Sequence, residues 1–202
     1  MIKYIVSALV FGAVAGYLVN NFLSGFPTTL IADQLFSVAL IVALFVFGFS
    51  FGCDREAIRK MRQTGARIVV FPVLVALGSI VGGLVAGLIL QLNVAGATAV
   101  GSGIGWYTLS GPLMEQLLGA EWGTLAFSAN FLRELLTIVT IPLMVKLDKY
   151  APIASGGGTT MDTTLPLIVR YCGKDTLITA FSNGLVLSLI APFAVTAFAS
   201  LV

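Results

Sequence analysis

Five long apolar runs dominate this sequence and limit what the chain can fold into. They cover residues 4–23, 30–51, 68–92, 123–145 and 176–202. A helix of about 20 apolar residues is long enough to cross the hydrocarbon core of a bilayer. Each run therefore predicts a transmembrane helix. The first run is longer than the apolar part of a typical signal peptide and ends without a small-x-small cleavage site, so we expect it to be retained.

The composition excludes a soluble fold. Hydrophobic residues make up 58% of the 202 residues and charged residues 10%, and the mean hydropathy is +1.02. Soluble domains carry about 25% charged residues, so this chain lacks the polar surface that a cytosolic enzyme, a nucleic-acid binder or a disordered tail would have. We predict a single domain, residues 1–202, embedded in the lipid bilayer. The chain has no His, and Cys53 and Cys172 form no CxxC motif, so no metal site or cofactor is expected.

Two further apolar segments, residues 93–119 and 151–169, are interrupted by glycine and proline. The interrupting residues include Gly111, Pro112, Gly156, Gly157, Gly158 and Pro166. Three consecutive glycines weaken a helix by about 3 kcal/mol relative to alanine. Unwound backbone is tolerated in a bilayer only where protein or a water-filled cavity satisfies its polar groups. The sequence therefore predicts an all-α integral membrane protein with five transmembrane helices and two broken re-entrant hairpins.

The basic residues predict how the chain is oriented, because Lys and Arg concentrate in cytoplasmic loops. The loop after the second run carries five of them, Arg55, Arg59, Lys60, Arg62 and Arg67. If each broken segment returns to the side from which it enters, every basic residue except Arg133 faces the cytoplasm. This orientation places the N-terminus in the cytoplasm and the C-terminus outside.

The two broken segments share a short sequence echo. Thr-Leu-Ser-Gly-Pro-Leu at residues 108–113 is similar to Thr-Thr-Leu-Pro-Leu at 163–167. Paired Gly/Pro-interrupted segments in matching positions are typical of inverted-repeat transporters, in which they form the binding site. The alternative is a pair of surface loops with turn residues, but both segments are too apolar for ordinary surface connections.

Three charged residues fall at membrane depth in this prediction. Arg133 and Glu134 lie near the middle of the fourth run, and Asp162 lies in the second broken segment. A central charge costs a transmembrane helix about 2.5–3.5 kcal/mol and usually marks an ion, proton or substrate path.

Neighbouring residues on a helix point about 100° apart, so Arg133 and Glu134 cannot simply neutralise each other. One arrangement directs Arg133 to backbone carbonyls or a neighbouring helix and leaves Glu134 facing a pore. The other pairs Arg133 with Asp162 and caps Glu134 with Asn130, which would be a buried polar knot without a transport role. The residues alone leave both arrangements open.

Two buried carboxyl groups suit a proton and a cationic substrate that compete for the same site, because burial favours the protonated form. A proton is therefore the expected coupling ion, with sodium possible. The carboxylate of an amino acid would need other donors, such as backbone N–H groups of the second break and nearby hydroxyls. The candidate hydroxyl residues are Thr159, Thr160, Thr163, Thr164 and, in the first broken segment, Ser110. Trp106 and Tyr107 are expected to be membrane-interface anchors.

Three motifs resemble the bacterial lysine exporter (LysO-type) family. They are Gly-Trp-Tyr-Thr-Leu-Ser-Gly-Pro-Leu at 105–113, Phe-Ser-Ala-Asn-Phe-Leu-Arg-Glu at 127–134 and Gly-Thr-Thr-Met-Asp-Thr-Thr-Leu-Pro at 158–166. The resemblance implies L-lysine efflux across the inner membrane, coupled to protons, with an essential intramembrane Glu/Asp pair. The matching positions in this chain are Glu134 and Asp162, the two acids already selected from the charge pattern.

The resemblance also implies a longer chain, because single-chain members carry further N-terminal membrane segments. We therefore expect the C-terminal part of a split member, completed by a small N-terminal membrane partner subunit or by a homo-oligomer. ATP-driven export is not expected, because the chain has no nucleotide-binding motif. Three alternatives remain: a sodium-coupled organic-anion transporter with Arg133 as the substrate's partner, an intramembrane aspartyl protease, and a non-catalytic scaffold subunit.

Overall fold

The computed structural model describes residues 67–202 continuously and selected residues before them. The latter are residues 10–12, 14–19, 21, 34, 35, 38, 41, 42, 45, 46, 49, 52, 53, 55, 59 and 65. The chain divides into two units, Met1–Ser50 and Phe51–Val202. Residues 10–12 and 14–19 of the first unit are helical, and large parts of the predicted spans 4–23 and 30–51 lie outside the described residues.

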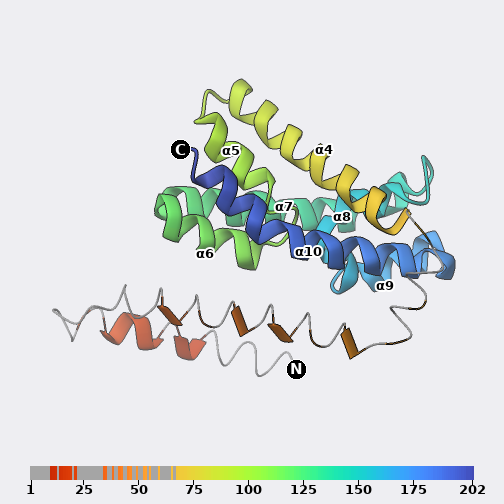
Figure 1. Ribbon diagram of the computed structural model, residues 1–202, viewed down its shortest axis with the longest axis horizontal. Helices are drawn as coiled ribbons and strands as arrows, with labels where there is room; N and C mark the ends of the chain where they lie inside the picture. The colour runs from red at the N-terminus through yellow and green to blue at the C-terminus, as the bar shows by residue number, and fades with distance from the viewer. Residues whose placement is uncertain are drawn as a thin grey trace. The chain divides into compact units, whose positions relative to one another are not determined.

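Three long helices frame the second unit, and each is long and apolar enough to cross a membrane. They are α4 (Arg67–Ile89), α7 (Ala120–Met144) and α10 (Leu177–Ala199) (Figure 1). Helix α10 is the central one, because 56% of its apolar stretch is buried, against 22% for α4 and 28% for α7. Within residues 67–202 every regular element is a helix, so this part of the chain is an all-α membrane protein.

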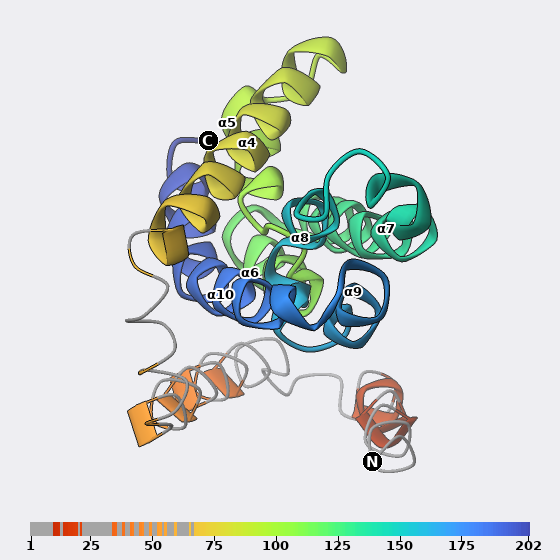
Figure 2. The same cartoon turned by 90° about the vertical axis from the view of Figure 1, so that its right-hand side faces the viewer.

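Each predicted broken segment consists of short helices joined by a break. The first contains α5 (Val94–Gly101) and α6 (Tyr107–Leu118). The second contains α8 (Ala151–Gly156), the 3₁₀ helix η1 (Gly157–Met161) and α9 (Leu165–Cys172), and η2 (Lys174–Thr176) leads into α10. Helix α8 packs on α7 and η1 packs on α10, so the second broken segment lies between these two long helices (Figure 2).

Glycine allows α4 and α5 to approach backbone to backbone. A Cβ atom on Gly83 would lie 2.7 Å from the carbonyl oxygen of Ala97, and a Cβ on Gly101 would lie 2.7 Å from that of Ser79. The N-terminus of α5 is capped by Asn93, whose side-chain oxygen accepts the Gly96 N–H at 3.1 Å. The close glycine contacts hold α5 against α4, and this packing positions the first break, which follows α5.

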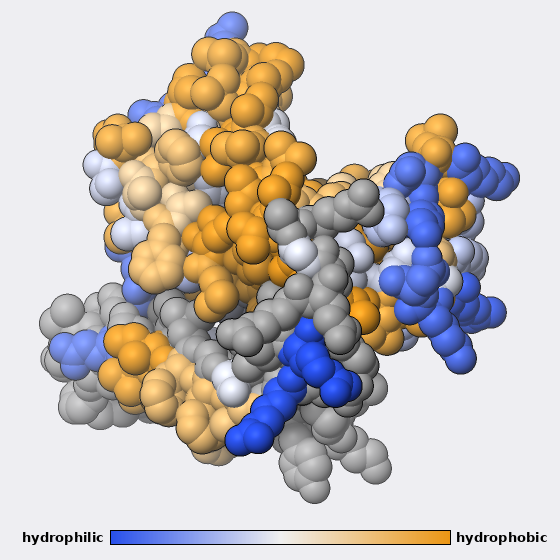
Figure 3. Space-filling view, turned by 45° about the vertical axis from the view of Figure 1, so that its right-hand side comes forward, coloured by the Kyte–Doolittle hydropathy of each residue, from blue (hydrophilic) through white to orange (hydrophobic). Residues whose placement is uncertain are grey.

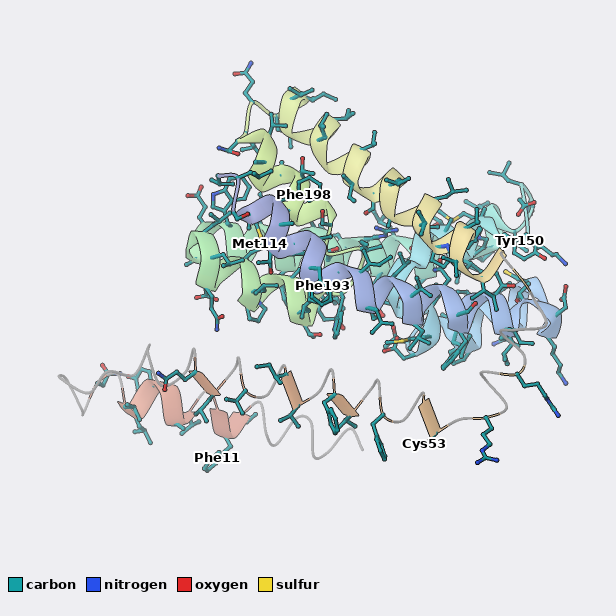
Figure 4. The ribbon with its side chains drawn as sticks, in the orientation of Figure 1. Phe11, Cys53, Met114, Tyr150, Phe193 and Phe198 are labelled. Atoms are coloured by element: carbon teal, nitrogen blue, oxygen red, sulfur yellow. The ribbon has the colours of Figure 1, made fainter. Side chains whose placement is uncertain are left out.

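Two apolar clusters identify the opposite ends of this unit. At one end Ile141 of α7, Ala180 of α10 and Phe71 of α4 pack together with the residues of the second broken segment. At the other end Met114 of α6 packs beside Phe198 of α10 (Figure 4). Helices α7 and α10 therefore have their C-terminal ends at opposite ends of the unit.

Figure 3 shows a broad hydrophobic area on one face, with a band of hydrophilic residues at the right of the view. Exposed side chains on α4 and α7 include Leu74 (61%), Leu77 (52%) and Val139 (74%). Exposed apolar surface of this extent suits contact with lipid.

Candidate functional site

The two breaks meet near the middle of the unit. The N–H of Gly158 donates a hydrogen bond of 2.9 Å to the carbonyl oxygen of Ile104, so the backbone of the second break is bonded to that of the first. Gly157 has a φ of +63°, and a Cβ on it would overlap the Ile104 carbonyl. Glycine is required here by both the backbone conformation and the close approach.

Asn130 of α7 holds the first break. Its side-chain oxygen accepts the Gly105 N–H at 2.7 Å. Its amide nitrogen lies 3.0 Å from the Val100 carbonyl, 2.9 Å from that of Ala126 and 3.2 Å from the Ser110 hydroxyl. Asn130 therefore pairs the Gly105 N–H and adds a bond to the Val100 carbonyl, which also accepts the Gly103 N–H, so this predicted site residue has a supporting role.

Asn183 of α10 holds the second break in a similar way. Its amide nitrogen lies 3.1 Å from both the Gly157 carbonyl and the Thr160 hydroxyl, and 3.3 Å from the Ile153 carbonyl. The side chain is fully buried, and its Oδ1 atom has no hydrogen-bond partner among the described residues. Asn183 is not among the residues predicted from the sequence, although a lone Asn within an apolar run was a usable signal.

Arg133 of α7 is directed at the end of α8. Its Nε donates to the Ser155 carbonyl at 2.8 Å and its Nη2 to the Ala154 carbonyl at 3.1 Å, while Nη1 donates to the Ser79 hydroxyl at 2.7 Å. These carbonyls lie at the C-terminal end of α8, where a positive charge is favoured. Of the two arrangements left open by the sequence, this is the one in which Arg133 binds backbone carbonyls.

A cavity of about 460 Å³ opens beside the Arg133 guanidinium, between α4, α7 and α8. Its walls are apolar apart from Arg133 and Ser79, and include Phe71, Leu74 and Val75. Because three of the five guanidinium N–H groups bind protein oxygens, Arg133 is well anchored at the edge of this cavity.

Glu134 lies on a different side of α7 from Arg133 and is 5% exposed. The Tyr107 ring packs edge-to-face against Phe127 and Phe131, which lie on the same face of α7 as Glu134. Within residues 67–202, the ion pair that the structure shows joins Lys149 to Asp175, so neither Glu134 nor Arg133 is neutralised by an ion pair there. The expectation that Tyr107 is an interface anchor stays a prediction.

Asp162 follows η1 and is exposed. Its Oδ1 accepts the Thr163 N–H at 2.6 Å, and no described basic residue forms an ion pair with it. The polar-knot alternative, with an Arg133–Asp162 pair and Glu134 capped by Asn130, is therefore not what the described residues form. Asp162 presents a carboxylate at the second break without a fixed counter-ion.

The candidate threonines divide into two groups. The hydroxyl oxygen of Thr160 lies 2.7 Å from the Gly157 carbonyl oxygen and 2.8 Å from that of Ala180, and these two acceptors share its one hydrogen. The hydroxyl of Thr159 donates to the Gly156 carbonyl at 3.0 Å and lies 3.3 Å from the Thr164 hydroxyl. These three side chains are buried and bind within the protein, whereas Thr163 is exposed beside Asp162.

The remaining candidates shape the two breaks. Gly111 packs on Phe127 of α7, where a Cβ would lie 3.0 Å from the Phe127 Cβ. Pro112 lies inside α6, and Pro166 lies in the first turn of α9, where proline is tolerated. Gly156 ends α8, and Gly157 and Gly158 begin η1. Among the described residues, no group of three or more Cys, Asp or Glu side chains could hold a metal ion.

Long apolar helices around two breaks that meet beside buried charged groups define a class of protein, the membrane transporters built on broken helices. The chain belongs to the lysine exporter LysO family, whose family model matches residues 6–199. The family is one of transporters, so the protease alternative is excluded.

Two curated relatives agree with this assignment. The lysine exporter LysO of Escherichia coli (strain K12) is 32% identical over 178 residues, which are 88% of this chain and 59% of that protein. A putative lysine exporter of Haemophilus influenzae is 28% identical over 196 residues, 97% of each protein. No solved structure matches the chain.

The expectation of a split family member is not borne out by these comparisons. The chain spans 59% of the length of the E. coli relative, but the H. influenzae relative matches it over 97% of both sequences. A length similar to that of this chain therefore occurs in another protein described as an exporter. The expectation of a small partner subunit or a homo-oligomer remains a prediction.

Proposed function

We propose that this protein exports L-lysine from the cytoplasm across the inner membrane in exchange for protons. The observation that carries this proposal is the placement of Glu134. Glu134 is buried on α7, one turn after the Asn130 side chain that holds the first break, and it has no ion-pair partner among residues 67–202.

The charge balance of this site favours a cationic passenger. Arg133, the basic residue next to Glu134, binds carbonyl groups of α8 and leaves the carboxylates available. A buried carboxyl group is stabilised either by a cation beside it or by a proton on it. Lysine and protons therefore compete for Glu134 and Asp162, and this competition couples lysine export to proton entry. Protons that enter from outside displace lysine from the two carboxylates. Their release inside leaves the carboxylates charged and ready to bind lysine again.

The relatives support the choice of substrate, since both are described as lysine exporters. The sodium-coupled organic-anion alternative depends on Arg133, which lines the cavity beside α4 and can still offer N–H groups to an anion. Substrate competition with lysine, arginine and an organic acid separates these two possibilities.

The test is export of labelled L-lysine from proteoliposomes under an imposed pH gradient. We expect Glu134→Gln and Asp162→Asn each to lower the export rate by about 10- to 100-fold, because hydrogen bonds to charged groups contribute roughly 1.5–3 kcal/mol. Glu121→Gln, an exposed acid in the first turn of α7, is the matched control and should transport at the parent's rate. If both acid variants export lysine as fast as the parent, the proposal is wrong. Export that follows a sodium gradient instead would favour the alternative.

A further inference from the structure

Most of the hydroxyl and N–H groups expected from the sequence to bind an amino-acid carboxylate are occupied within the protein. The Thr159 hydroxyl donates to the Gly156 carbonyl, and the one hydrogen of the Thr160 hydroxyl is shared between two carbonyls. The N–H of Gly158 is bonded to the first break. A carboxylate therefore needs donors outside these groups of the second break.

Arg133 has hydrogen-bond donors that the protein does not use. A guanidinium group carries five N–H donors. One donor on each of its three nitrogens binds a protein oxygen, those of Ser155, Ala154 and Ser79. One N–H on each terminal nitrogen is left without a partner among the described residues. Two N–H groups are the number that a guanidinium uses to bind a carboxylate.

The positive charge of Arg133 also has no carboxylate beside it within residues 67–202, where the ion pair that the structure shows joins Lys149 to Asp175. Glu134 follows Arg133 on α7, but neighbouring side chains on a helix point about 100° apart. The Arg133 side chain is half-buried, so water hydrates its charge only in part. An anionic group of a ligand would be stabilised next to it, because a charge-assisted hydrogen bond is stronger than a neutral one.

The cavity beside Arg133 offers space for such a ligand. Its volume of about 460 Å³ lies within the range of roughly 300–1,000 Å³ that is usual for small-molecule sites. Four of its lining residues follow the helical spacing of three and four along α4 and so share one face, namely Phe71, Leu74, Val75 and Gly78. Gly78 leaves this face open, since a Cβ built on it would meet nothing within 4 Å. The cavity therefore combines one cationic group with apolar walls.

We propose that this cavity binds the α-carboxylate of the passenger, with Arg133 as the binding residue, so that the protein accepts cationic α-amino acids and discriminates against diamines and amides. This inference rests on the proposed function and defines its substrate class. The two unused N–H groups of Arg133 donate to the carboxylate, and the apolar face of α4 contacts the methylene groups next to it. The cationic end of the passenger remains the part that Glu134 and Asp162 recognise.

A comparison of L-lysine with L-lysinamide tests the role of the carboxylate, because the amide keeps the cationic chain and removes the negative charge. The unfolding temperature of the purified protein in detergent, measured against ligand concentration, gives the affinity for each compound. We expect the parent to bind lysine about tenfold or more tightly than lysinamide, as the loss of a hydrogen bond to a charged group implies. Cadaverine, which lacks the carboxylate altogether, should bind as weakly as lysinamide. Arg133→Gln should remove the preference for lysine.

A purely structural role for Arg133 predicts a different result. If Arg133→Gln weakens the binding of lysine and lysinamide equally and keeps their ratio, Arg133 only anchors α8 and the proposal is wrong. It is also wrong if the parent binds both compounds alike, or if propionate, a carboxylate without an ammonium group, stabilises the parent as well as lysine does. A parent protein that neither binds nor exports lysine would overturn the proposed function and, with it, this inference.

A second pair of variants leaves Arg133 in place. Gly78→Leu fills the cavity, and Gly82→Leu, one turn further along α4, is the matched control outside the cavity lining. At both positions a Cβ would meet nothing within 4 Å, so we expect both variants to fold. Gly78→Leu should weaken lysine binding by about tenfold or more, because its side chain occupies the space of the ligand, and Gly82→Leu should bind lysine as the parent does. Binding of lysine by Gly78→Leu with the parent's affinity would contradict the proposal, even if Arg133→Gln does not fold.

Discussion

One amide side chain from a long helix holds each break in place. Asn130 of α7 binds the first break through both its oxygen and its nitrogen, and Asn183 of α10 binds the second break through its nitrogen. The two side chains differ in the hydrogen bonding of the amide oxygen. That of Asn183 is buried without a partner among the described residues. A buried acceptor without a donor lowers the net contribution of the side chain that carries it.

We therefore expect Asn130→Ala to cost more stability than Asn183→Ala. Removal of Asn130 leaves the Gly105 N–H without a partner and removes the hydrogen bonds to the Val100 and Ala126 carbonyls, and should lower the free energy of unfolding by about 2–4 kcal/mol. Removal of Asn183 also removes an unpaired oxygen, so the loss should be about 1–2 kcal/mol. Denaturant unfolding in detergent, followed by circular dichroism, measures both values. The reverse order would contradict the roles assigned to the two side chains.

The contact between Arg133 and the end of α8 depends on the shape of the guanidinium group as well as on its charge. The guanidinium reaches Ser155, Ala154 and Ser79 together, whereas a lysine ammonium cannot span three acceptors in this geometry. We expect Arg133→Lys to lower the lysine export rate by about tenfold or more, because the end of α8 loses its anchor. Arg170→Lys, at an exposed position of α9, is the control and should export at the parent's rate. Equal export by Arg133→Lys and the parent would show that the charge alone is sufficient.

At the scale of an element, the second break depends on a single glycine. Gly157 combines a φ of +63° with a contact that leaves no room for a Cβ atom next to Ile104. A non-glycine residue in such a conformation is strained by about 1–2 kcal/mol before any steric overlap is counted. The glycine at the start of η1 therefore determines where the second break lies.

Gly157→Ala should consequently lower the free energy of unfolding by about 2 kcal/mol or more and abolish export. The matched control is Gly82→Ala on α4, where a Cβ would meet nothing within 4 Å. That change should be neutral or stabilise the protein by up to about 1 kcal/mol, because alanine favours helix. Thermal unfolding and lysine export of the two variants, measured side by side, test the difference. If both behave alike, the contact with Ile104 does not matter.

Local signals account for what could be predicted from the sequence. The glycine run at 156–158 and the apolar runs indicate the breaks and the long helices, because helix propensity and hydropathy act over short stretches. The bond from Gly158 to Ile104 joins residues far apart in the chain, and no local pattern encodes it. The direction of the Arg133 side chain stayed open for the same reason, since it depends on where α8 ends. Asn183 was missed because one polar residue hardly changes the mean hydropathy of an apolar run.

At the scale of the whole molecule, the basic residues after α7 and before α10 lie at the same end. The Lys149 ammonium is 2.6 Å from the Asp175 carboxylate, which joins the turn after α7 to η2. The Tyr150 ring lies 6.3 Å from that of Phe71 in the first turns of α4. The hydrogen bond from Lys149 to Asp175, together with the charge of Asp175, raises the pKa of Lys149, so this ammonium stays charged at neutral pH.

This layout predicts the labelling of single cysteines by a membrane-impermeant thiol reagent. In a background with Cys53→Ser and Cys172→Ser, we expect Lys149→Cys to react from the cytoplasmic side only and Glu121→Cys from the outside only. Glu121 lies in the first turn of α7, and Lys149 lies in the turn that follows its C-terminal end. Inverted vesicles and intact cells provide the two sides, and a lysate labels both variants as a control for reactivity. Reaction of both from one side would contradict the orientation.

The contact between Gly158 and Ile104 joins the two breaks through a main-chain hydrogen bond. A single main-chain hydrogen bond has a net worth of about 0.5–1.5 kcal/mol. A proton that moves down a gradient of one pH unit releases about 1.4 kcal/mol. In the proposed exchange, one proton that moves down such a gradient therefore supplies about as much free energy as this one hydrogen bond contributes.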